Sequence, residues 1–253
     1  EHGMQPWRGR WHFFCDWWLA HVTDRIIFVS RQVMQSYQAR SGVALAKCAL
    51  IPNGVVSDGG AGDRAALRRA FGWGAEERVV ISVGRLAPEK GYDDLLTAFE
   101  RVVTRVPARL VIIGDGPERE ALVRMKLTAK LDHAVQFVGV QEDVRPWLAA
   151  ADLYVQPSHR EGLPLAILEA MAVGIPVLAT RVGDVEALIR HGQEGYLIPP
   201  GHSFVLAQAI QEILQRLDRQ RPVIEAARRV VTERYSMEQM LTQIESLYIS
   251  LGT

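Results

Sequence analysis

The sequence predicts an α/β fold organised around a doubly wound parallel sheet. From about residue 26 onward, short β-rich runs alternate with helical patterns, a rhythm typical of parallel strands joined by helices. Because the runs are apolar throughout rather than alternating, we expect helices to cover both faces of the sheet. The predicted strands are Ile26–Ser30, Val79–Gly84, Leu110–Gly114, Val135–Gly139, Leu153–Gln156 and Val177–Thr180.

Helices are predicted from apolar residues at helical spacing. One begins near Tyr92, and its apolar face consists of Leu95, Phe99, Val102 and Val106. At the far end, Ser236 and Gln239 have the spacing of a capping box, and a long apolar stripe follows. The apolar stripe of this last helix needs another surface of the protein to pack against.

Turn-forming residues divide the chain. Ile51–Gly54 combines Pro with Asn-Gly, and the small, polar stretch Ser57–Asp63 follows. The chain opens with Glu1 rather than Met, so we expect an upstream portion to precede it. The predicted divisions are 1–55, 56–235 and 236–253.

Composition excludes several classes of protein. Acidic and basic residues balance at 29 each, so the excess positive charge that favours nucleic acid binding is missing. Two cysteines are too few for a disulfide framework, and neither has a metal-type Cys/His spacing. No apolar run is long enough to span a membrane, and no signal-peptide pattern opens the sequence. A cytoplasmic setting is therefore expected.

The segment 157–176 is the most informative. It follows a buried strand and opens a helix, with Pro164 suited to the first turn and Gly174 to a left-handed C-terminal cap. Backbone N–H groups at such a helix start form an anion site at the carboxyl end of the sheet, where a diphosphate would fit. The amides expected there are those of Gly162, Leu163 and Leu165.

Two glutamates in this segment are candidate ligand-binding residues. Glu169 lies one to two turns into an otherwise apolar helix, where a carboxylate needs partners, and ribose hydroxyl groups would supply them. Local physics leaves an alternative open. Glu161 could cap the helix start while Glu169 pairs with a nearby arginine.

A second cluster lies at Gly84–Gly91, again between a strand and a helix. Lys90 precedes the positive end of a helix dipole, which costs about 0.3 to 1 kcal/mol unless negative charge is near. Asp93 and Asp94 could supply that charge, or a bound diphosphate could. In the second case Arg85 would grip phosphate oxygens with its planar fork. By contrast, Gly114–Arg119 lacks the last glycine of a dinucleotide fingerprint, so we do not predict NAD.

Together these motifs resemble glycosyltransferase family 4 over nearly the whole chain. The most specific match is the Glu-x7-Glu motif from Glu161 to Glu169, and Ile51–Val55, Gly84–Arg85 with Lys90, and Gly114–Pro117 support it. The resemblance implies a GT-B fold. In it, a Rossmann-like doubly wound sheet forms the C-terminal donor domain, segment 1–55 is the remnant of a partial N-terminal Rossmann-like domain on the acceptor side, and the last helix crosses back.

The resemblance also implies roles for single residues. Arg85 and Lys90, beside Gly84, would hold the diphosphate of a nucleoside diphosphate sugar, Glu161 would face hydroxyl groups of the transferred sugar, and Glu169 would bind the ribose. Gly162, Leu163 and Leu165 would complete the phosphate site, and Val138 would lie against the nucleobase. His2 resembles the acceptor-side histidine that approaches the sugar, although a lone histidine is more often structural or solvated. Where many relatives have Gly-Gly, this chain has Gly183–Asp184.

Aromatic residues near the start could serve a further purpose. Trp7, Trp11, Phe14 and Trp18 recur at helical spacing between basic residues, a pattern that could rest in a membrane interface. The alternative is burial against a missing part of the acceptor domain.

The resulting hypothesis is a retaining hexosyltransferase that moves a sugar from a nucleoside diphosphate sugar to a hydroxyl acceptor without a metal or other cofactor. No Asp-x-Asp metal signature is visible. Two alternatives remain: an epimerase-like enzyme acting on a nucleotide sugar, and a noncatalytic nucleotide-sugar-binding module.

Overall fold

The computed structural model describes residues 10–20, 22–56 and 62–252. Its strands are β1 (Ile26–Phe28), β2 (Cys48–Leu50), β3 (Arg78–Val83), β4 (Ala108–Ile113), β5 (Val135–Gly139), β6 (Leu153–Gln156), β7 (Val177–Thr180) and β8 (Tyr196–Ile198). Its α-helices are α1 (Arg10–Leu19), α2 (Arg31–Ser41), α3 (Arg64–Ala70), α4 (Tyr92–Val102), α5 (Arg119–Thr128), α6 (Arg145–Ala150), α7 (Leu165–Val173), α8 (Val185–Leu188), α9 (Ser203–Gln215), α10 (Arg221–Arg234) and α11 (Met237–Leu251). Short 3-10 turns cover Leu45–Lys47, Pro88–Lys90 and Leu217–Arg219.

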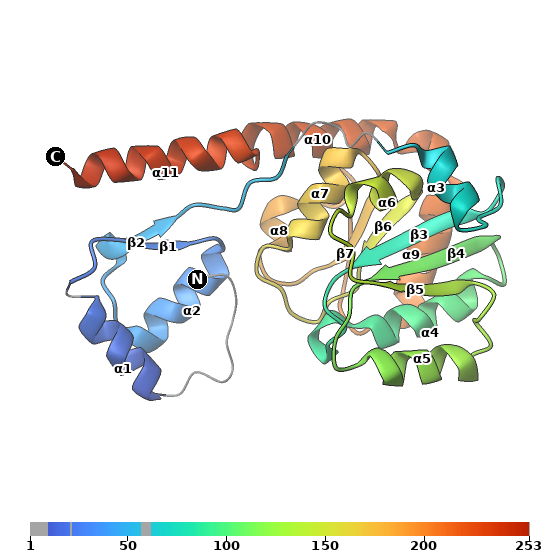
Figure 1. The fold of residues 1–253 in the computed structure, drawn as a ribbon, viewed down its shortest axis with the longest axis horizontal. Helices are drawn as coiled ribbons and strands as arrows, with labels where there is room; N and C mark the ends of the chain where they lie inside the picture. Colours follow the sequence, from blue (N-terminus) through green and yellow to red (C-terminus); the bar gives the residue numbers. More distant parts are fainter. Residues whose placement is uncertain (1–9, 21, 57–61, 253) are drawn as a thin grey trace.

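The main sheet has six parallel strands in the order β5-β4-β3-β6-β7-β8 (Figure 1). All six predicted strands are present, and three of them match in full. The strands β2 and β8 were not predicted. The strand order reverses direction between β3 and β6, and such a switch point leaves a crevice outside the carboxyl ends of the two strands.

Helices cover both faces of this sheet, as the continuous apolar strands predict. Successive residues of β3 face opposite sides: Val79 and Ile81 pack with α6, α7 and α10, whereas Val80 packs with α4, α5 and α9. Figure 1 shows α4 and α5 below the sheet and α6, α7 and α10 above it. The two resulting cores hold the strands in a fixed register.

The N-terminal part, made of α1, α2, β1 and β2, has its own small core. Strands β1 and β2 are parallel, and Phe28, Val33 and Tyr37 are buried together. Ser30 caps α2 through the N–H of Val33 at 3.3 Å, and Gly42 ends the helix in the left-handed conformation with φ of 68°.

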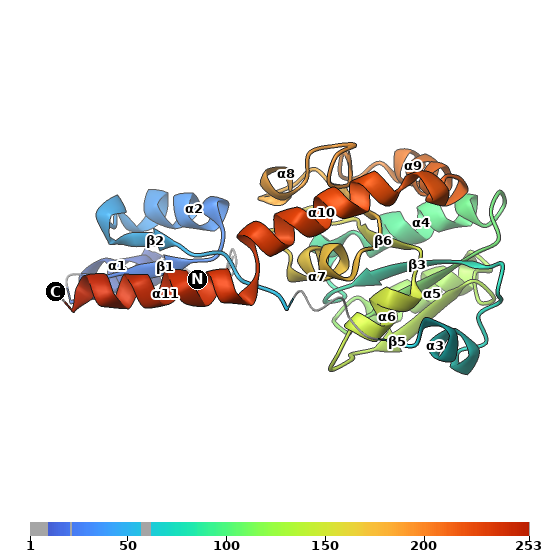
Figure 2. The same ribbon diagram turned by 90° about the horizontal axis from the view of Figure 1, so that it is seen from above.

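The last helix starts beside the segment that joins the two parts. Val55 forms a bridge with Ser236, and Ser236 caps α11 through the N–H of Gln239 at 3.2 Å, as predicted. From there α11 extends alongside the N-terminal part (Figures 1 and 2). None of its side chains is buried, and Leu241, Tyr248 and Ile249 are exposed. Among the described residues, no helix has the length and apolar character needed to cross a membrane.

Candidate functional site

Two loops meet at the carboxyl ends of β3 and β6. The N–H groups of His159 and Arg160 donate to the carbonyl oxygen of Glu89 at 2.9 and 3.3 Å. Gly91 has φ of 64°, and a Cβ there would lie 2.3 Å from the carbonyl oxygen of Pro157. Only glycine permits this approach, so Gly91 brings the loop that carries Lys90 against the loop that carries Glu161.

Lys90 and Glu161 form the centre of the site. The Lys90 Nζ lies 2.7 Å from the Glu161 Oε1, and their side chains are 21% and 7% exposed. Two of the alternatives that the sequence left open are therefore wrong. Glu161 does not cap α7, because its carboxylate accepts from Lys90, Gln156 and Ser158. Lys90 is compensated by Glu161 rather than by an aspartate of α4.

The aspartates of α4 face a different neighbour. Asp94 Oδ2 lies 3.5 Å from the Nε2 of His159, and burial raises the pKa of the Asp94 carboxyl above its ordinary value. Possible ligand atoms of Asp93, Asp94 and His159 lie within 4.8 Å of one another. In the sequence, Asp93 and Asp94 follow Lys90, and His159 precedes Glu161.

The start of α7, which follows Glu161, has free backbone amides. Pro164 precedes the first helical residue, and no side chain caps the helix. Within the described part of the chain, the N–H groups of Gly162, Leu163 and Leu165 have no hydrogen-bond acceptor. Unpaired N–H groups at a helix start attract anions. Gly174 ends the helix with φ of 88°, as the sequence predicts.

Arg85 and Gly84 lie at the end of β3. Arg85 is exposed and, among the described residues, has no hydrogen-bond or ion-pair partner. A Cβ at Gly84 would lie 3.0 Å from the hydroxyl of Tyr92. The Arg85 guanidinium is thus free to bind a ligand, but it does not contact Glu161.

Glu169 lines a separate pocket of about 230 Å³, together with Val55, Arg145 and Met237. Burial raises the pKa of Glu169, the Asp143 carboxylate raises it further, and the Arg145 guanidinium lowers it. Arg145 forms a 2.9 Å ion pair with Asp143. An arginine near Glu169, one of the alternatives that the sequence left open, is therefore present as Arg145, although Arg145 pairs with the Asp143 carboxylate.

The remaining predicted residues either lie farther from this crevice or fall in parts of the chain that the structure does not describe. Val138 is half-buried at the end of β5, and its carbonyl accepts from the Gln141 side chain at 3.0 Å. Trp11 and Trp18 are exposed on α1. His2, Trp7 and the side chain of Phe14 lie outside the described residues.

Comparison with known proteins identifies the family. Residues 63–230 match the family described as "Glycosyl transferases group 1". The chain belongs to this family. Among similar proteins, the N-acetyl-alpha-D-glucosaminyl L-malate synthase of Bacillus anthracis is 33% identical over 186 residues, which cover 74% of this chain and 49% of that protein. A GDP-mannose-dependent alpha-(1-6)-phosphatidylinositol monomannoside mannosyltransferase of Mycobacterium tuberculosis is 32% identical over 235 residues, 88% of this chain and 60% of that protein.

Solved structures share the fold of this chain. The crystal structure of Anabaena Alr3699/HepE in complex with UDP and glucose has a TM-score of 0.87 and 25% identity, covering 96% of this chain and 68% of that chain. The GT-B fold implied by the sequence motifs is therefore confirmed. The chain spans about half the length of the first of these relatives and three fifths of the second.

Three residues beside Glu161 were not predicted as site residues. Gln156 and Ser158 donate to its carboxylate, and Asp184 lies across the turn at Gly162. The sequence held a signal for Gln156 and Ser158, because Tyr154, Gln156 and Ser158 are spaced two residues apart. In a strand, this spacing places Tyr154 and Gln156 on the same face of the sheet, and Ser158 follows just beyond the strand.

Proposed function

We propose that the protein transfers a hexose from a nucleoside diphosphate sugar to a hydroxyl acceptor, with retention of anomeric configuration and without a metal ion. The observation that carries the proposal is the set of groups at the carboxyl ends of β3 and β6. The partly buried Lys90–Glu161 pair lies next to three unpaired amides at the start of α7. The Anabaena protein of the same fold, whose crystal structure is a complex with UDP and glucose, supports this choice.

In this proposal the cations and amides bind the leaving group. Breaking the bond between the sugar C1 and the diphosphate oxygen leaves the electron pair on the diphosphate. The acceptor oxygen then bonds to C1, and its proton passes to the departing diphosphate. Lys90, Arg85 and the amides of α7 stabilise the departing negative charge. Losing one such preorganised donor typically lowers the rate about 10²- to 10³-fold.

The other candidate residues bind the rest of the donor. Glu161 accepts hydrogen bonds from hydroxyl groups of the sugar, and Glu169, in its own pocket, accepts them from the ribose. Val138 at the end of β5 contacts the base, and His2 approaches the sugar from the acceptor side. The domains divide at residues 55 and 235, and the acceptor site lies mostly outside this chain.

The exposed tryptophans of α1 allow a role at a membrane surface. Trp11 and Trp18 would lie at a lipid interface, with the protein peripheral to the inner face of the membrane. Sedimentation with anionic vesicles tests this: a Trp11→Ala, Trp18→Ala double variant should bind vesicles less than the wild type, and equal binding would contradict the role.

A thermal-shift series with UDP, GDP and ADP tests the donor class. A ligand at 100 times its Kd stabilises a protein by about 2.7 kcal/mol, so the preferred diphosphate should raise the Tm clearly. Each shift is measured with and without EDTA, because Asp93, Asp94 and His159 could hold a cation beside Lys90. A shift that EDTA abolishes would contradict the metal-free proposal.

Turnover is tested by release of UDP or GDP from UDP-glucose, UDP-N-acetylglucosamine or GDP-mannose in the presence of candidate acceptors. Product analysis separates the proposal from its alternatives. A new glycosidic bond supports transfer, an epimerised nucleotide sugar supports the epimerase, and binding without any release of diphosphate supports a noncatalytic module.

A further inference from the structure

We propose that Tyr154, Gln156 and Ser158 are positioning residues that fix the Glu161 carboxylate so that one oxygen faces the protein and the other faces the donor sugar. This inference rests on the proposed function, in which Glu161 contacts the transferred sugar. It assigns a purpose to a buried polar chain beneath the site.

Three donors converge on a single oxygen of Glu161. Lys90 Nζ, Gln156 Nε2 and Ser158 Oγ each lie 2.7 Å from Oε1. Within the described residues, none of the contacts reaches Oε2. An oxygen that accepts three hydrogen bonds has no capacity left for a ligand, so hydroxyl groups of the sugar reach Oε2.

The heavy-atom contacts allow one consistent assignment of donors and acceptors among Ser158, Gln156 and Glu161. Ser158 donates its only hydrogen to Glu161 and accepts one from Gln156 Nε2 at 2.8 Å. The second hydrogen of the Gln156 amide goes to Glu161. A flipped amide would point its oxygen at the carboxylate, so the negative charge of Glu161 selects the orientation found.

Tyr154 locks the opposite end of the Gln156 amide. Its hydroxyl donates to Gln156 Oε1 through a short hydrogen bond. Tyr154 is fully buried, and burial raises the pKa of its hydroxyl well above the ordinary value of 10.0, so the phenol remains a donor at every working pH. Hydrogen-bond donation therefore runs one way, from the Tyr154 hydroxyl to the Gln156 amide and from that amide to the Glu161 carboxylate.

The neighbouring strand holds the loop that carries this network. Thr180, at the end of β7, donates its hydroxyl to the carbonyl oxygens of Ser158 and Gln156, the latter at 3.3 Å. Both Gln156 and Ser158 are almost fully buried, at 2% and 0% exposed. Groups fixed in this way have little freedom to compensate for a lost partner.

The test replaces Gln156 by methionine, which keeps the volume but removes both donors. Nucleotide affinity is measured with UDP or GDP, whichever gives the larger thermal shift, and donor use with the matching UDP-glucose or GDP-mannose. We expect the Kd of the diphosphate to be unchanged. We expect kcat to fall roughly ten- to hundredfold, the effect of a misplaced catalytic group.

A matched control exists elsewhere in the domain. Gln220 is also buried, at 4% exposed, and its Oε1 accepts from the Tyr196 hydroxyl at 2.7 Å. Gln220→Met thus breaks the same kind of tyrosine–glutamine pair away from Glu161, and should leave kcat unchanged. Equal losses in the two variants would show that Gln156 is merely structural and would overturn the inference.

A second variant gives a signature that a structural role cannot produce. In Gln156→Glu, a protonated carboxyl can still donate to Glu161, but two adjacent carboxylates repel each other. The groups facing this pair are Lys90, Tyr92 and Tyr154. The ratio of variant to wild-type kcat should therefore be highest at low pH and fall as pH rises, and a ratio independent of pH would overturn the inference.

Ser158→Ala covers the case in which Gln156→Met does not fold. It removes one donor and should lower kcat in the same direction with the Kd of the diphosphate unchanged. If the wild type turns over the donor and Glu161→Ala abolishes turnover, yet Ser158→Ala and Gln156→Met retain it, only this inference fails. If the wild type binds no nucleotide sugar, the proposed function fails and the inference with it.

Discussion

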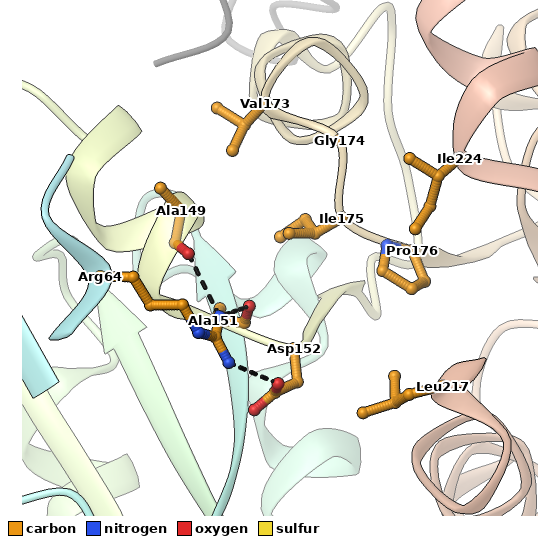
Figure 3. Close-up of a pocket in the computed structure, with 10 residues that line it drawn as sticks. All are labelled: Arg64, Ala149, Ala151, Asp152, Val173, Gly174, Ile175, Pro176, Leu217 and Ile224. Atoms are coloured by element: carbon orange, nitrogen blue, oxygen red, sulfur yellow. Dashed lines mark hydrogen bonds and ion pairs between the residues drawn. The ribbon is translucent and has the colours of Figure 1, made fainter. Parts of the chain in front are cut away.

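Strand β6 has a buried carboxylate at each end, and the two are bonded in opposite ways. Asp152 precedes the strand, and its side chain is 9% exposed. Its Oδ1 accepts from Arg64 at 2.6 Å, and its Oδ2 accepts from Arg68 at 3.3 Å and from the N–H of Val79 at 2.7 Å. Figure 3 shows the Arg64 contact beside a pocket of about 310 Å³ at this end of the sheet.

Glu161, beyond the other end of β6, is equally buried and also paired with a cation, but all its donors share one oxygen. The number of carboxylate oxygens that accept hydrogen bonds thus distinguishes a structural role from a ligand-binding role, which burial and charge alone do not. A carboxylate with both oxygens satisfied holds the fold together. One that keeps an oxygen free is available to a ligand.

The largest effect on stability is expected at Asp152. Asp152→Ala leaves Arg64 and Arg68 with carbonyl acceptors but without their carboxylate, and leaves the N–H of Val79 without its acceptor. Breaking such a pair on the buried side of a protein costs about 3 to 5 kcal/mol. Urea unfolding should show this loss, while the folded fraction retains its affinity for diphosphate. Asp132→Ala is the control, because Asp132 is 54% exposed and pairs with Lys126 at the surface, where an ion pair contributes about 0 to 1 kcal/mol. Equal losses would remove the distinction drawn for Asp152.

At the other end of β6 the effect should fall on ligand binding and rate. Lys90→Ala is expected to lower kcat about 10²- to 10³-fold, because a preorganised cation is lost. It should weaken UDP or GDP binding more than binding of the nucleoside. Lys126→Ala is the matched control, since its side chain is 17% exposed, close to the 21% of Lys90, and lies 2.9 Å from a carboxylate. Equal loss of nucleotide and nucleoside affinity would reject a phosphate role for Lys90.

Glu169 extends the comparison to a carboxylate that accepts no hydrogen bond from the other described residues. Its pKa is raised by burial, so folding favours the protonated form, and stability declines as pH rises past the ordinary value of 4.5. Glu169→Gln should therefore raise the Tm at neutral pH, and the gain should vanish below about pH 4.

The same variant should bind nucleotide less well. Losing a charged hydrogen bond to the ribose weakens UDP or GDP binding roughly tenfold, while binding of inorganic pyrophosphate is unchanged. Isothermal titration of both ligands measures the difference. If the variant is less stable at pH 7, or loses pyrophosphate binding, Glu169 has a structural role like that of Asp152 rather than a ligand-binding role like that of Glu161.

Much of this arrangement follows from the sequence. The apolar runs of β5, β6 and β7 predict their strands in full, and turn chemistry places Lys90 and Glu161 at strand ends that parallel pairing brings together. The strands β2 and β8 were missed, and each is followed within two residues by a proline, Pro52 or Pro199. The sequence also could not assign partners. Which donors reach Glu161, and on which oxygen, depends on side chains that only the packed β3–β6 edge brings together.

Asp184 stands where the family resemblance leads us to expect glycine, and the sequence alone does not explain it. Its carboxylate accepts from the N–H groups of Arg31 at 2.6 Å and Gln32 at 3.3 Å at the start of α2. Its own N–H donates to the Gly162 carbonyl at 3.2 Å. Although Asp184 adjoins the candidate site, both its oxygens are occupied, so it resembles Asp152 rather than Glu161.

Asp184→Ala should therefore act mainly on stability, costing about 0.5 to 2 kcal/mol as the loss of a helix cap does. The matched control is Asp63→Ala, since Asp63 caps α3 through the N–H of Ala66 at 2.9 Å, far from Gly162. Both variants are compared by urea unfolding and by kcat. The stability losses should be similar, and because Asp184, unlike Asp63, joins α2 to the turn at Gly162, only its variant should also lower kcat, by a few-fold. If Asp184→Ala lowered kcat as much as Lys90→Ala does, a carboxylate whose two oxygens both accept hydrogen bonds could still contribute to catalysis, and the distinction between Asp152 and Glu161 would fail.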